Sequence, residues 1–232
     1  MADELQFEVE GEGRLRLERR QGVIAGWTGR DPAAIEHHIE ELAAIGVPRP
    51  SSVPLYYRVS AQAFTQAPAI QVVGDGSSGE VEPLLFDSGE ALYLGLGSDH
   101  TDRSLETYSV ALSKQICAKP VARQAWRFEE VAGHLEQLEL RSWIEEAEGA
   151  ARVLYQEGTI AGIRPFAELL AGTPVAAGGG RMAAGAMMLC GTFPVISGGV
   201  RPALAFHMEL RDPRLDRSIA CSYRVEVLPN VS

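Results

Sequence analysis

Cysteine is scarce in this chain of 232 residues, and its three cysteines follow no regular spacing. Cys117, Cys190 and Cys221 are odd in number, lie far apart and include no Cys-x-x-Cys pair. A disulfide framework and a zinc ribbon both need paired or closely spaced cysteines, so the sequence argues against both. Unpaired cysteines are typical of a reducing compartment, and we expect a cytoplasmic protein.

Basic residues are too few and too scattered for a nucleic-acid-binding protein. Lys and Arg number 21 against 31 Asp and Glu, which gives a formal charge of −10 and no basic patch. The same charge offers no attraction to an anionic membrane surface. The first residues, Met1–Leu5, are acidic where a signal peptide is basic and then apolar, and no apolar run approaches membrane-spanning length. We therefore expect neither a nucleic-acid nor a membrane partner.

Several signatures of enzyme classes are also missing. The chain has no Gly-x-Ser-x-Gly nucleophile elbow and no cysteine beside a histidine, so covalent serine or thiol catalysis has little support. The run Gly178–Arg181 lacks the Lys-Ser/Thr pair that follows the glycines of a phosphate-binding loop. No internal repeat is present.

What is present indicates a globular, β-rich chain. It is 46% hydrophobic and 22% charged, and its length suits one domain. Helical spacing predicts helices at 33–45, 123–135 and 165–170, while 106–116 fits a helix or a strand. Alternation and turn residues predict an N-terminal hairpin within 1–20, packed on a main domain of 21–232, and strands at 21–27, 55–59, 70–73, 138–144, 151–155, 187–190, 203–210 and 218–227, with two more inside 77–97.

One stretch, Ser77–Asp102, places acidic residues at the ends of two of these strands. Side chains alternate across a strand, so Glu80 and Glu82 project from one face about 6 to 7 Å apart. The second strand, Leu92–Gly97, ends in glycine and delivers Asp99 at its mouth. Because Mg²⁺ and Mn²⁺ prefer hard oxygen ligands, these three carboxylates are the candidate metal ligands.

Simpler explanations of the same residues remain open. Glu80 and Glu82 on a strand are more often a solvent-exposed face than metal ligands. The residues around Asp99 are good N-cap residues, so this turn could cap a helix. A cap residue and a ligand both present a side-chain oxygen at the end of an element, so the two roles are compatible. We expect supporting or structural roles for His100 and Asp102.

Two further groups suit proton transfer and charge stabilisation. His38 and Glu41 are three residues apart on a predicted helix and face the same way, so the carboxylate could orient the imidazole as a general base. A solvated helix face explains the pair equally well, and His37 is an alternative base. Lys114 could hold a developing enolate or carboxylate, although a lone lysine is usually solvated.

The order of these motifs resembles the fumarylacetoacetate hydrolase superfamily over roughly residues 20–228. There, a strand ending in glycine leads to a helix with His-x-x-Glu, an apolar strand ending in Lys, Glu-x-Glu, and an Asp followed four residues later by Arg. A lysine, a Gln-x-Gly-x-Thr turn and a Gly-Asp-x-Ile-x-x-Gly-Thr-Pro loop come next. The matching positions are, in order, Gly26-Trp27, His38-Ile39-Glu40-Glu41, Leu55-Tyr56-Tyr57-Arg58, Glu80-Val81-Glu82, Asp99 with Arg103, Lys114, Gln156-Glu157-Gly158-Thr159 and Gly185 to Phe193.

Four positions depart from the superfamily pattern. Ala186 replaces the Asp, Phe193 the Pro and Arg58 the Lys, while Glu106 stands where a Gln is common. Because Arg58 and Glu106 would touch the substrate, these changes bear on the identity of the substrate more than on the metal.

The resemblance implies an α+β, predominantly β fold: the mixed β-sandwich roll of the fumarylacetoacetate hydrolase C-terminal domain, usually dimeric, with residues 21–232 as the catalytic domain. It implies Mg²⁺ or Mn²⁺ as the cofactor and a small keto acid as the substrate. The implied metal ligands are Glu80, Glu82 and Asp99, and the implied catalytic residues are His38, Glu41 and Lys114. The implied substrate-binding residues are Arg58, Arg103, Glu106, Gln156 and Thr192.

The activity expected from this resemblance is cleavage of a carbon–carbon bond, by hydrolysis or decarboxylation, in a 2-keto or 1,3-dicarbonyl acid through a metal-stabilised enolate. Superfamily precedent also covers dehydration and isomerisation, so the fold does not choose the reaction. A sugar-acid dehydratase or keto–enol isomerase is one alternative, and a non-catalytic, metal-dependent keto-acid-binding protein is another. An intact His38–Glu41 pair favours an enzyme.

Overall fold

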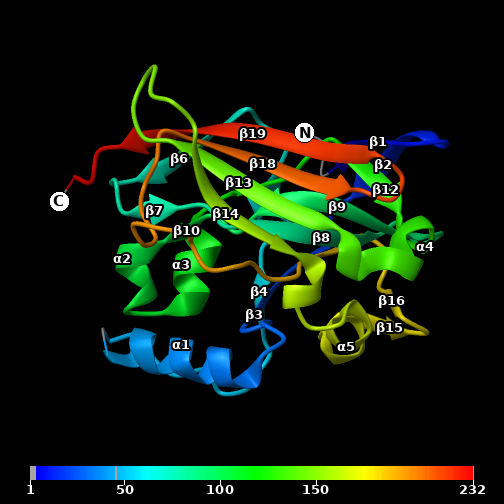
Figure 1. Ribbon diagram of the computed structural model, residues 1–232, viewed down its shortest axis with the longest axis horizontal. Coiled ribbons are helices and arrows are strands. Elements are labelled where there is room, and N and C mark those ends of the chain that lie inside the picture. The colour runs from blue at the N-terminus through cyan, green and yellow to red at the C-terminus, as the bar shows by residue number, and fades with distance from the viewer. Residues whose placement is uncertain (1–3, 45, 232) are drawn as a thin grey trace.

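Two mixed β-sheets form the framework of the protein in a computed structural model that describes residues 4–44 and 46–231 (Figure 1). The larger sheet has eight strands in the order β2 (Gly13–Glu18), β1 (Glu4–Val9), β12 (Gln124–Arg127), β9 (Leu92–Ser98), β8 (Val81–Asp87), β17 (Ala186–Leu189), β3 (Gln21–Gly26) and β4 (Leu55–Val59). The smaller sheet has five strands in the order β14 (Val153–Thr159), β13 (Glu139–Glu145), β18 (Ala205–Asp212), β19 (Arg217–Leu228) and β6 (Ala69–Val73).

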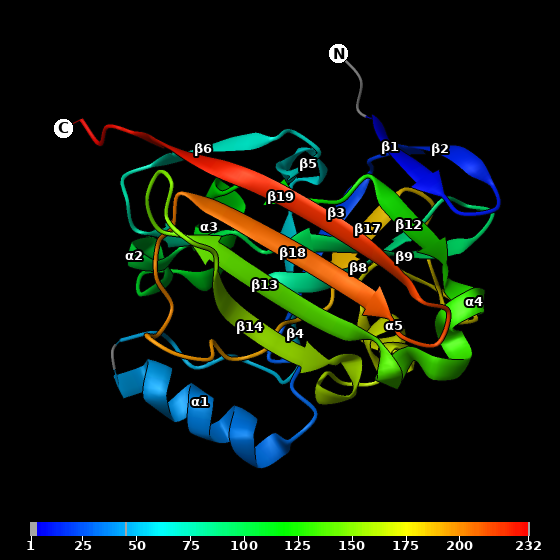
Figure 2. The ribbon, with the colours of Figure 1, turned by 45° about the horizontal axis from the view of Figure 1, so that its top comes forward.

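Short helices and strand pairs link the two sheets. The helices are α1 (Pro32–Ala44), α2 (Arg103–Glu106), α3 (Val110–Ile116), α4 (Phe128–Val131) and α5 (Phe166–Gly172), with 3₁₀ helices η1 (Ala61–Ala63), η2 (Ala132–Gln137) and η3 (Ile160–Gly162). The paired strands are β5 (Phe64–Thr65) with β11 (Lys119–Pro120), β7 (Ser77–Ser78) with β10 (Thr101–Asp102), and β15 (Ala176–Gly178) with β16 (Arg181–Met182). Helices α2 and α3 lie at one end of the sheets and α4 and α5 at the other (Figures 1 and 2).

The main core lies between the two sheets, where the five-stranded sheet covers β8 and β9 (Figure 2). Leu140 on β13 and Leu85 on β8 belong to this core. A second core, which contains Phe7, Leu84 and Phe86, packs on the opposite face of the larger sheet. Strands β8 and β9 are therefore buried on both faces, which explains why their sequences are nearly continuous apolar runs.

Two acidic side chains nevertheless lie on the buried strand β8. A buried carboxylate is costly unless it is paired or hydrogen-bonded. Asp87, at the end of the strand, accepts hydrogen bonds from the guanidinium of Arg181 at 2.5 and 2.6 Å. Glu82, near the start, accepts one from the backbone N–H of Gly191 at 2.7 Å. The fold thus holds Glu82 in place at the point where β8 begins.

Most elements agree with the sequence, and one prediction is wrong. The predicted helix at 33–45 is α1, with Ile45 outside the described residues, and 106–116 is largely the helix α3. The predicted helix at 123–135 is instead strand β12 followed by α4 and η2. Its first residues pair with β1 and β9, with Trp126 opposite Leu94, so sheet pairing overrides the local helical spacing.

The N-terminal hairpin, β1 and β2, extends the larger sheet because β1 pairs in parallel with β12. The division of the chain near residue 20 stays a prediction. Among the helices of the described residues, none is long and apolar enough to cross a membrane.

Candidate metal centre

The start of β8 and the end of β9 bring three carboxylates together. Glu80 precedes β8, Glu82 lies on it opposite Gly97 of β9, and Asp99 follows β9. The backbone N–H of Asp99 donates to the carbonyl oxygen of Glu80 at 2.9 Å. One carboxylate oxygen of each residue lies within 4.8 Å of the other two. The strand pairing therefore assembles the trio that strand alternation predicts.

The donor set suits a hard divalent cation. Glu82 and Asp99 are 3% and 0% exposed, and all three residues offer carboxylate oxygens, the ligands that Mg²⁺ and Mn²⁺ prefer. The backbone N–H of Gly191 orients the Glu82 carboxylate, as outer-shell partners of metal ligands do. Gly191 has φ +107°, and a Cβ there would overlap the Thr28 hydroxyl, so the position needs glycine.

Arg103 fixes the Glu80 side of the cluster. Its guanidinium lies 3.2 Å from a carboxylate oxygen of Glu80 and 3.2 Å from one of Glu106, and its Nε donates to the Ser78 hydroxyl at 2.7 Å. The Asp102 carboxylate caps α2, the helix that begins at Arg103, by accepting from a backbone N–H at 2.9 Å. Asp102 thus positions Arg103, and Arg103 holds Glu80 and Glu106.

The only two lysines of the chain both bind Asp99. Lys114 Nζ bonds Oδ2 of this carboxylate, and Lys119 Nζ lies 3.1 Å from Oδ1 and 2.5 Å from the carbonyl oxygen of His100. The sequence predicts Lys114 as a site residue that holds charge on the substrate, not as a partner of Asp99, and it does not single out Lys119. Two lysines five residues apart, just after the acidic stretch of a chain otherwise without lysine, were the available signal.

Burial and these charges act in opposite directions on the two buried carboxyl groups. Burial raises the pKa of Glu82 well above its usual range, and the charge of Asp99 adds to the increase. Burial also opposes ionisation of Asp99, but Lys114 and Lys119 outweigh it and lower the pKa of Asp99 below its usual range. Without a metal, Asp99 is therefore a carboxylate and Glu82 tends to keep its proton.

Metal affinity is accordingly expected to rise with pH. Below its raised pKa the Glu82 carboxyl carries a proton that an incoming cation must displace, so the proton competes with the metal. Calorimetric titrations with Mn²⁺ from mildly acidic to mildly alkaline pH, in buffers of different ionisation enthalpy, would measure both the affinity and the proton release. Unchanged affinity without proton release would contradict this expectation.

His100 lies beside the cluster but in a structural setting. It is fully buried, its Nδ1 is 3.0 Å from the Tyr223 hydroxyl, and its Nε2 is 2.9 Å from the Ser77 hydroxyl. Burial, with the charges of Lys119 and Arg103, lowers the pKa of His100 to about 3. This neutral imidazole, with both nitrogens bonded, joins β7 and β19 from the turn between β9 and β10, next in sequence to Asp99.

Gln156 and Thr192 contact the strand that carries the glutamates. The Thr192 hydroxyl donates to the carbonyl oxygen of Val81 at 2.7 Å, and the Val81 N–H donates to Gln156 Oε1 at 3.0 Å. Gln156 Nε2 donates in turn to the Thr192 hydroxyl at 2.8 Å. Both side chains thus lie against the residue between Glu80 and Glu82.

The structure does not place the Arg58 side chain near the carboxylate cluster. It places the ring of the neighbouring Tyr57 there, beside Lys114. Side chains alternate along β4, and the exposed Arg58 bonds Gln21 Oε1 at 3.1 Å. The ring of Tyr57 points the other way, with its centroid 5.7 Å from the Lys114 ammonium. The prediction that Arg58 binds substrate, at the position of the superfamily lysine, therefore has no contact in the structure that supports it.

His38 and Glu41 lie on α1, away from the carboxylates but connected to them. His38 Nδ1 is 3.6 Å from Glu41, and both side chains are mostly exposed. The rings of His38 and Trp27 have centroids 5.8 Å apart, and Trp27 Nε1 donates to the Tyr57 hydroxyl at 3.1 Å. Trp27 itself has φ +60°, which is rare for a bulky residue.

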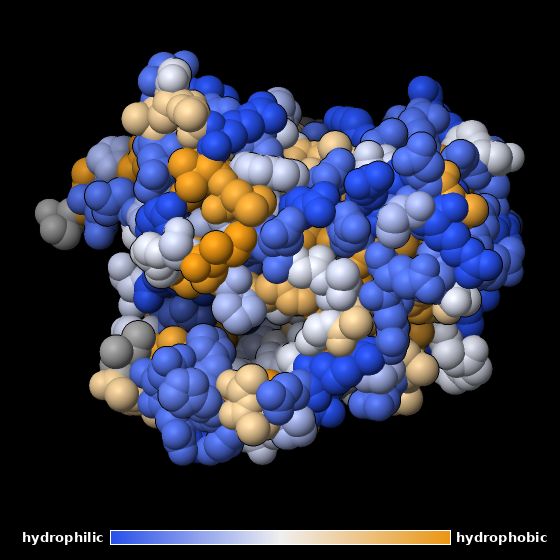
Figure 3. Space-filling model, in the orientation of Figure 1, coloured by the Kyte–Doolittle hydropathy of each residue, from blue (hydrophilic) through white to orange (hydrophobic). Residues whose placement is uncertain are grey.

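These contacts form a route from α1 through Trp27 and Tyr57 to Lys114 and Asp99. In the space-filling view the surface is hollowed between α1 and the part of the molecule that carries α3 and β4 (Figure 3).

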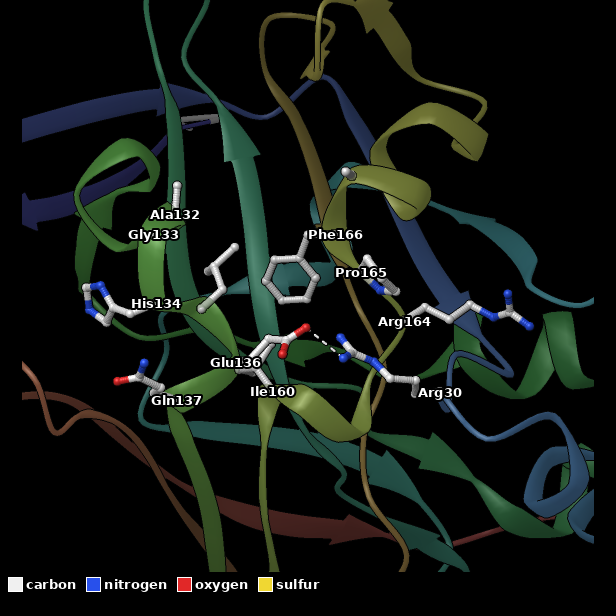
Figure 4. A pocket seen from close by; sticks show the side chains of 12 residues that line it. Arg30, Ala132, Gly133, His134, Glu136, Gln137, Ile160, Arg164, Pro165 and Phe166 are labelled. Atoms are coloured by element: carbon white, nitrogen blue, oxygen red, sulfur yellow. Dashed lines mark hydrogen bonds and ion pairs between the residues drawn. The ribbon is translucent and has the colours of Figure 1, made fainter.

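A separate cavity of about 410 Å³ lies between η2, η3 and the start of α5 (Figure 4). Its lining contains none of the predicted site residues. Arg30 and Glu136 form an ion pair of 2.6 Å in it, and the His134 imidazole bonds both oxygens of Asp212 at 3.0 Å. Because these charged groups already have partners, we assign this cavity no ligand.

The fold and the carboxylate cluster define a mostly β protein with a candidate divalent-metal centre, and solved structures share the fold. The crystal structure of Cg1458 matches with a TM-score of 0.61 and 12% identity, over 92% of this chain and 77% of that one. A complex of 2-keto-3-deoxy-D-arabinonate dehydratase with magnesium and 2,5-dioxopentanoate matches with a TM-score of 0.62 and 12% identity, over 94% of this chain and 78% of that one. The apo form of that dehydratase gives 0.62 at 13% identity.

A family model described as protein of unknown function (DUF2848) matches residues 25–223, and the chain belongs to this family. No curated protein matched the sequence. The fold of the solved neighbours is of the fumarylacetoacetate hydrolase-like type, which is consistent with the superfamily that the motif order resembles.

Proposed function

We propose that this protein is a divalent-metal-dependent enzyme of the fumarylacetoacetate hydrolase superfamily that cleaves a carbon–carbon bond in a small 2-keto or 1,3-dicarbonyl acid. The observation that carries the proposal is the cluster of Glu80, Glu82 and Asp99, with one oxygen of each within 4.8 Å of the others and the last two residues buried. We also propose that the protein works in the cytoplasm and forms a homodimer, as its resemblance to the superfamily implies.

A bound Mg²⁺ or Mn²⁺ supplies Lewis-acid polarisation of the substrate's keto and carboxylate oxygens. The protein's own residues bind and orient the substrate around it. Arg103, fixed by Glu80 and Glu106, and Lys114, beside Tyr57, offer positive charge to an anionic substrate in an otherwise acidic chain. Gln156 and Thr192 form the wall at Val81. Lys119 and the Gly191 N–H position the ligands Asp99 and Glu82.

His38 is the proposed general base, directly or through a water, and Glu41 orients it. The Glu41 carboxylate lies 3.6 Å from Nδ1 of His38, so Nε2 of His38 is left to take the proton. The exposed position of His38 beside Trp27 supports entry of the base from α1 when substrate fills the hollow. Catalytic contacts often tighten only in the complex with substrate, so the open geometry is compatible with this role.

Dehydration of a sugar-derived 2-keto acid is the second candidate reaction. The observation that favours it is the fold shared with 2-keto-3-deoxy-D-arabinonate dehydratase, whose structure was solved with magnesium and 2,5-dioxopentanoate. The same metal, base and cationic side chains would serve both reactions, because each can pass through an enolate next to the keto group. In dehydration the base would take a proton from the carbon next to the keto group, and the hydroxyl on the following carbon would leave as water. Isomerisation and binding without turnover are further outcomes that the same experiment separates.

Product analysis distinguishes these reactions. Metal-stripped protein is reloaded with Mn²⁺ and incubated with a panel of 2-keto, 1,3-dicarbonyl and 2-keto-3-deoxy sugar acids. The Mn²⁺ is then removed, and the products are identified by mass spectrometry and NMR, because an isomer has the same mass as its substrate. Cleavage gives two carbon fragments, whereas dehydration keeps the carbon chain and loses one water. If panel members bind and none is turned over, the proposal of an enzyme is wrong and a binding protein takes its place.

A further inference from the structure

Two lysines share the buried carboxylate of Asp99, and their other contacts differ. We propose that the Lys114 ammonium is a stand-in for the divalent cation, which occupies Asp99 Oδ2 when no metal is bound and leaves it when metal arrives. The inference rests on the metal site of the proposed function, and it assigns Lys114 a role that depends on metal loading.

The charges around the cluster are balanced without an ion. Arg103 pairs with Glu80 and Glu106, while Lys114 and Lys119 take the two oxygens of Asp99. Three cationic side chains therefore face three carboxylates, two of which are candidate metal ligands. A divalent ion bound by the same carboxylates would bring two more positive charges within a few ångströms of these side chains, and like charges at such distances repel strongly in a buried site.

Lys119 is fully buried and has two polar partners, the Asp99 carboxylate and the His100 carbonyl oxygen. It is 0% exposed, it lies on β11, which pairs in parallel with β5, and its ammonium also donates to the His100 carbonyl oxygen at 2.5 Å. Leaving Asp99 would strand this buried charge with a single partner, which is costly. Lys119 is therefore a fixed positioning residue for Asp99.

The Lys114 ammonium has a second possible partner, the ring of Tyr57. It lies in the last turn of α3 on a flexible four-carbon stem, and the ring of Tyr57 faces its ammonium with the centroid at 5.7 Å. An aromatic face attracts an ammonium ion through its quadrupole. The Tyr57 hydroxyl is held in turn by Trp27 Nε1, so the ring is a fixed platform on the side toward α1.

The consequence is an order of events. Until a cation replaces it, the Lys114 ammonium is bound to Asp99 and cannot serve an anionic substrate. Once a cation takes Asp99 Oδ2, the ammonium turns toward Tyr57, where it can bind the charge of the keto acid. Metal loading would thus prepare substrate binding through this chain's own lysine.

Calorimetric titration of metal-free protein with Mn²⁺ tests the competition. Lys114→Met removes the competing charge at similar volume, so this variant is expected to bind Mn²⁺ roughly tenfold more tightly than the wild type, or better. Lys114→Arg keeps the charge and is expected to bind within about threefold of the wild type. Weaker binding by Lys114→Met would overturn the inference and make Lys114 a support of the metal ligand. No binding by the wild type or by Lys114→Met would instead overturn the proposed function.

Thermal unfolding with and without Mn²⁺ provides a second readout, in which tighter metal binding also adds stability. Without metal, Lys114→Met leaves the buried carboxylates unbalanced, so its Tm is expected to fall below that of the wild type. With saturating Mn²⁺ the difference is expected to close, because the ion then balances the charge. An equal loss of Tm in both conditions would mean that Lys114 is a purely structural lysine.

Discussion

Glu82→Gln is expected to remove divalent-metal binding and, with it, turnover. Glu82 is a candidate ligand on a strand that is buried on both faces, and its carboxylate accepts a hydrogen bond from the Gly191 N–H. The amide is a neutral and weaker ligand. Loss of an outer-shell partner alone typically costs 10- to 100-fold in metal affinity, so loss of a ligand is expected to cost at least about a hundredfold. Calorimetry with Mn²⁺ measures the effect.

Glu106→Gln is the matched control for metal binding. Glu106 bonds the same Arg103 that holds Glu80, yet it lies outside the group of three carboxylates. The Glu106→Gln variant should bind Mn²⁺ with an affinity within a few-fold of the wild type. A Glu82→Gln variant with wild-type affinity would remove Glu82 from the metal site.

His38→Asn is expected to lower kcat by about 10² to 10⁴, the usual contribution of a positioned general base. Mn²⁺ affinity should stay unchanged, because His38 lies on α1 and reaches the carboxylates only through Trp27, Tyr57 and Lys114. The measurement pairs steady-state kinetics on a substrate identified by product analysis with calorimetry on the same preparation. A loss of kcat without a loss of metal separates the base from the metal centre.

His37→Asn is a close control for this prediction. His37 lies next in sequence on the same exposed helix and also contacts Glu41, at 3.3 Å. Of these two histidines, His38 has its ring near that of Trp27, with the centroids 5.8 Å apart and the ring planes tilted by 49°. Wild-type kcat in His37→Asn with a large loss in His38→Asn supports His38. The reverse pattern would make His37 the base, and wild-type kcat in both would exclude the α1 dyad.

The cluster of three carboxylates was accessible from the sequence because its geometry is local. Alternation puts Glu80 and Glu82 on one side of a strand, and pairing of adjacent strands in a hairpin brings Asp99 next to them. Asp102 as a helix cap follows from equally local chemistry. For such features, residue type and spacing carry nearly all of the information.

Features that depend on distant segments were not accessible in this way. The stretch 123–135 has helical spacing, but its first residues pair with β1 and β9, whose partners lie far away in the sequence. The motif order pointed to Arg58, whereas the phase of β4 turns Tyr57 toward Lys114 and Arg58 toward Gln21. Lys119 was missed because its burial on Asp99 depends on the path of the chain after α3.

Anomalous scattering from a crystal of the protein soaked in Mn²⁺ tests the central claim most directly. The account predicts one strong manganese peak per chain, in contact with carboxylate oxygens of Glu80, Glu82 and Asp99, and Lys119 still bonded to Asp99. A crystal with intact, accessible sites and no manganese among these three residues would contradict it.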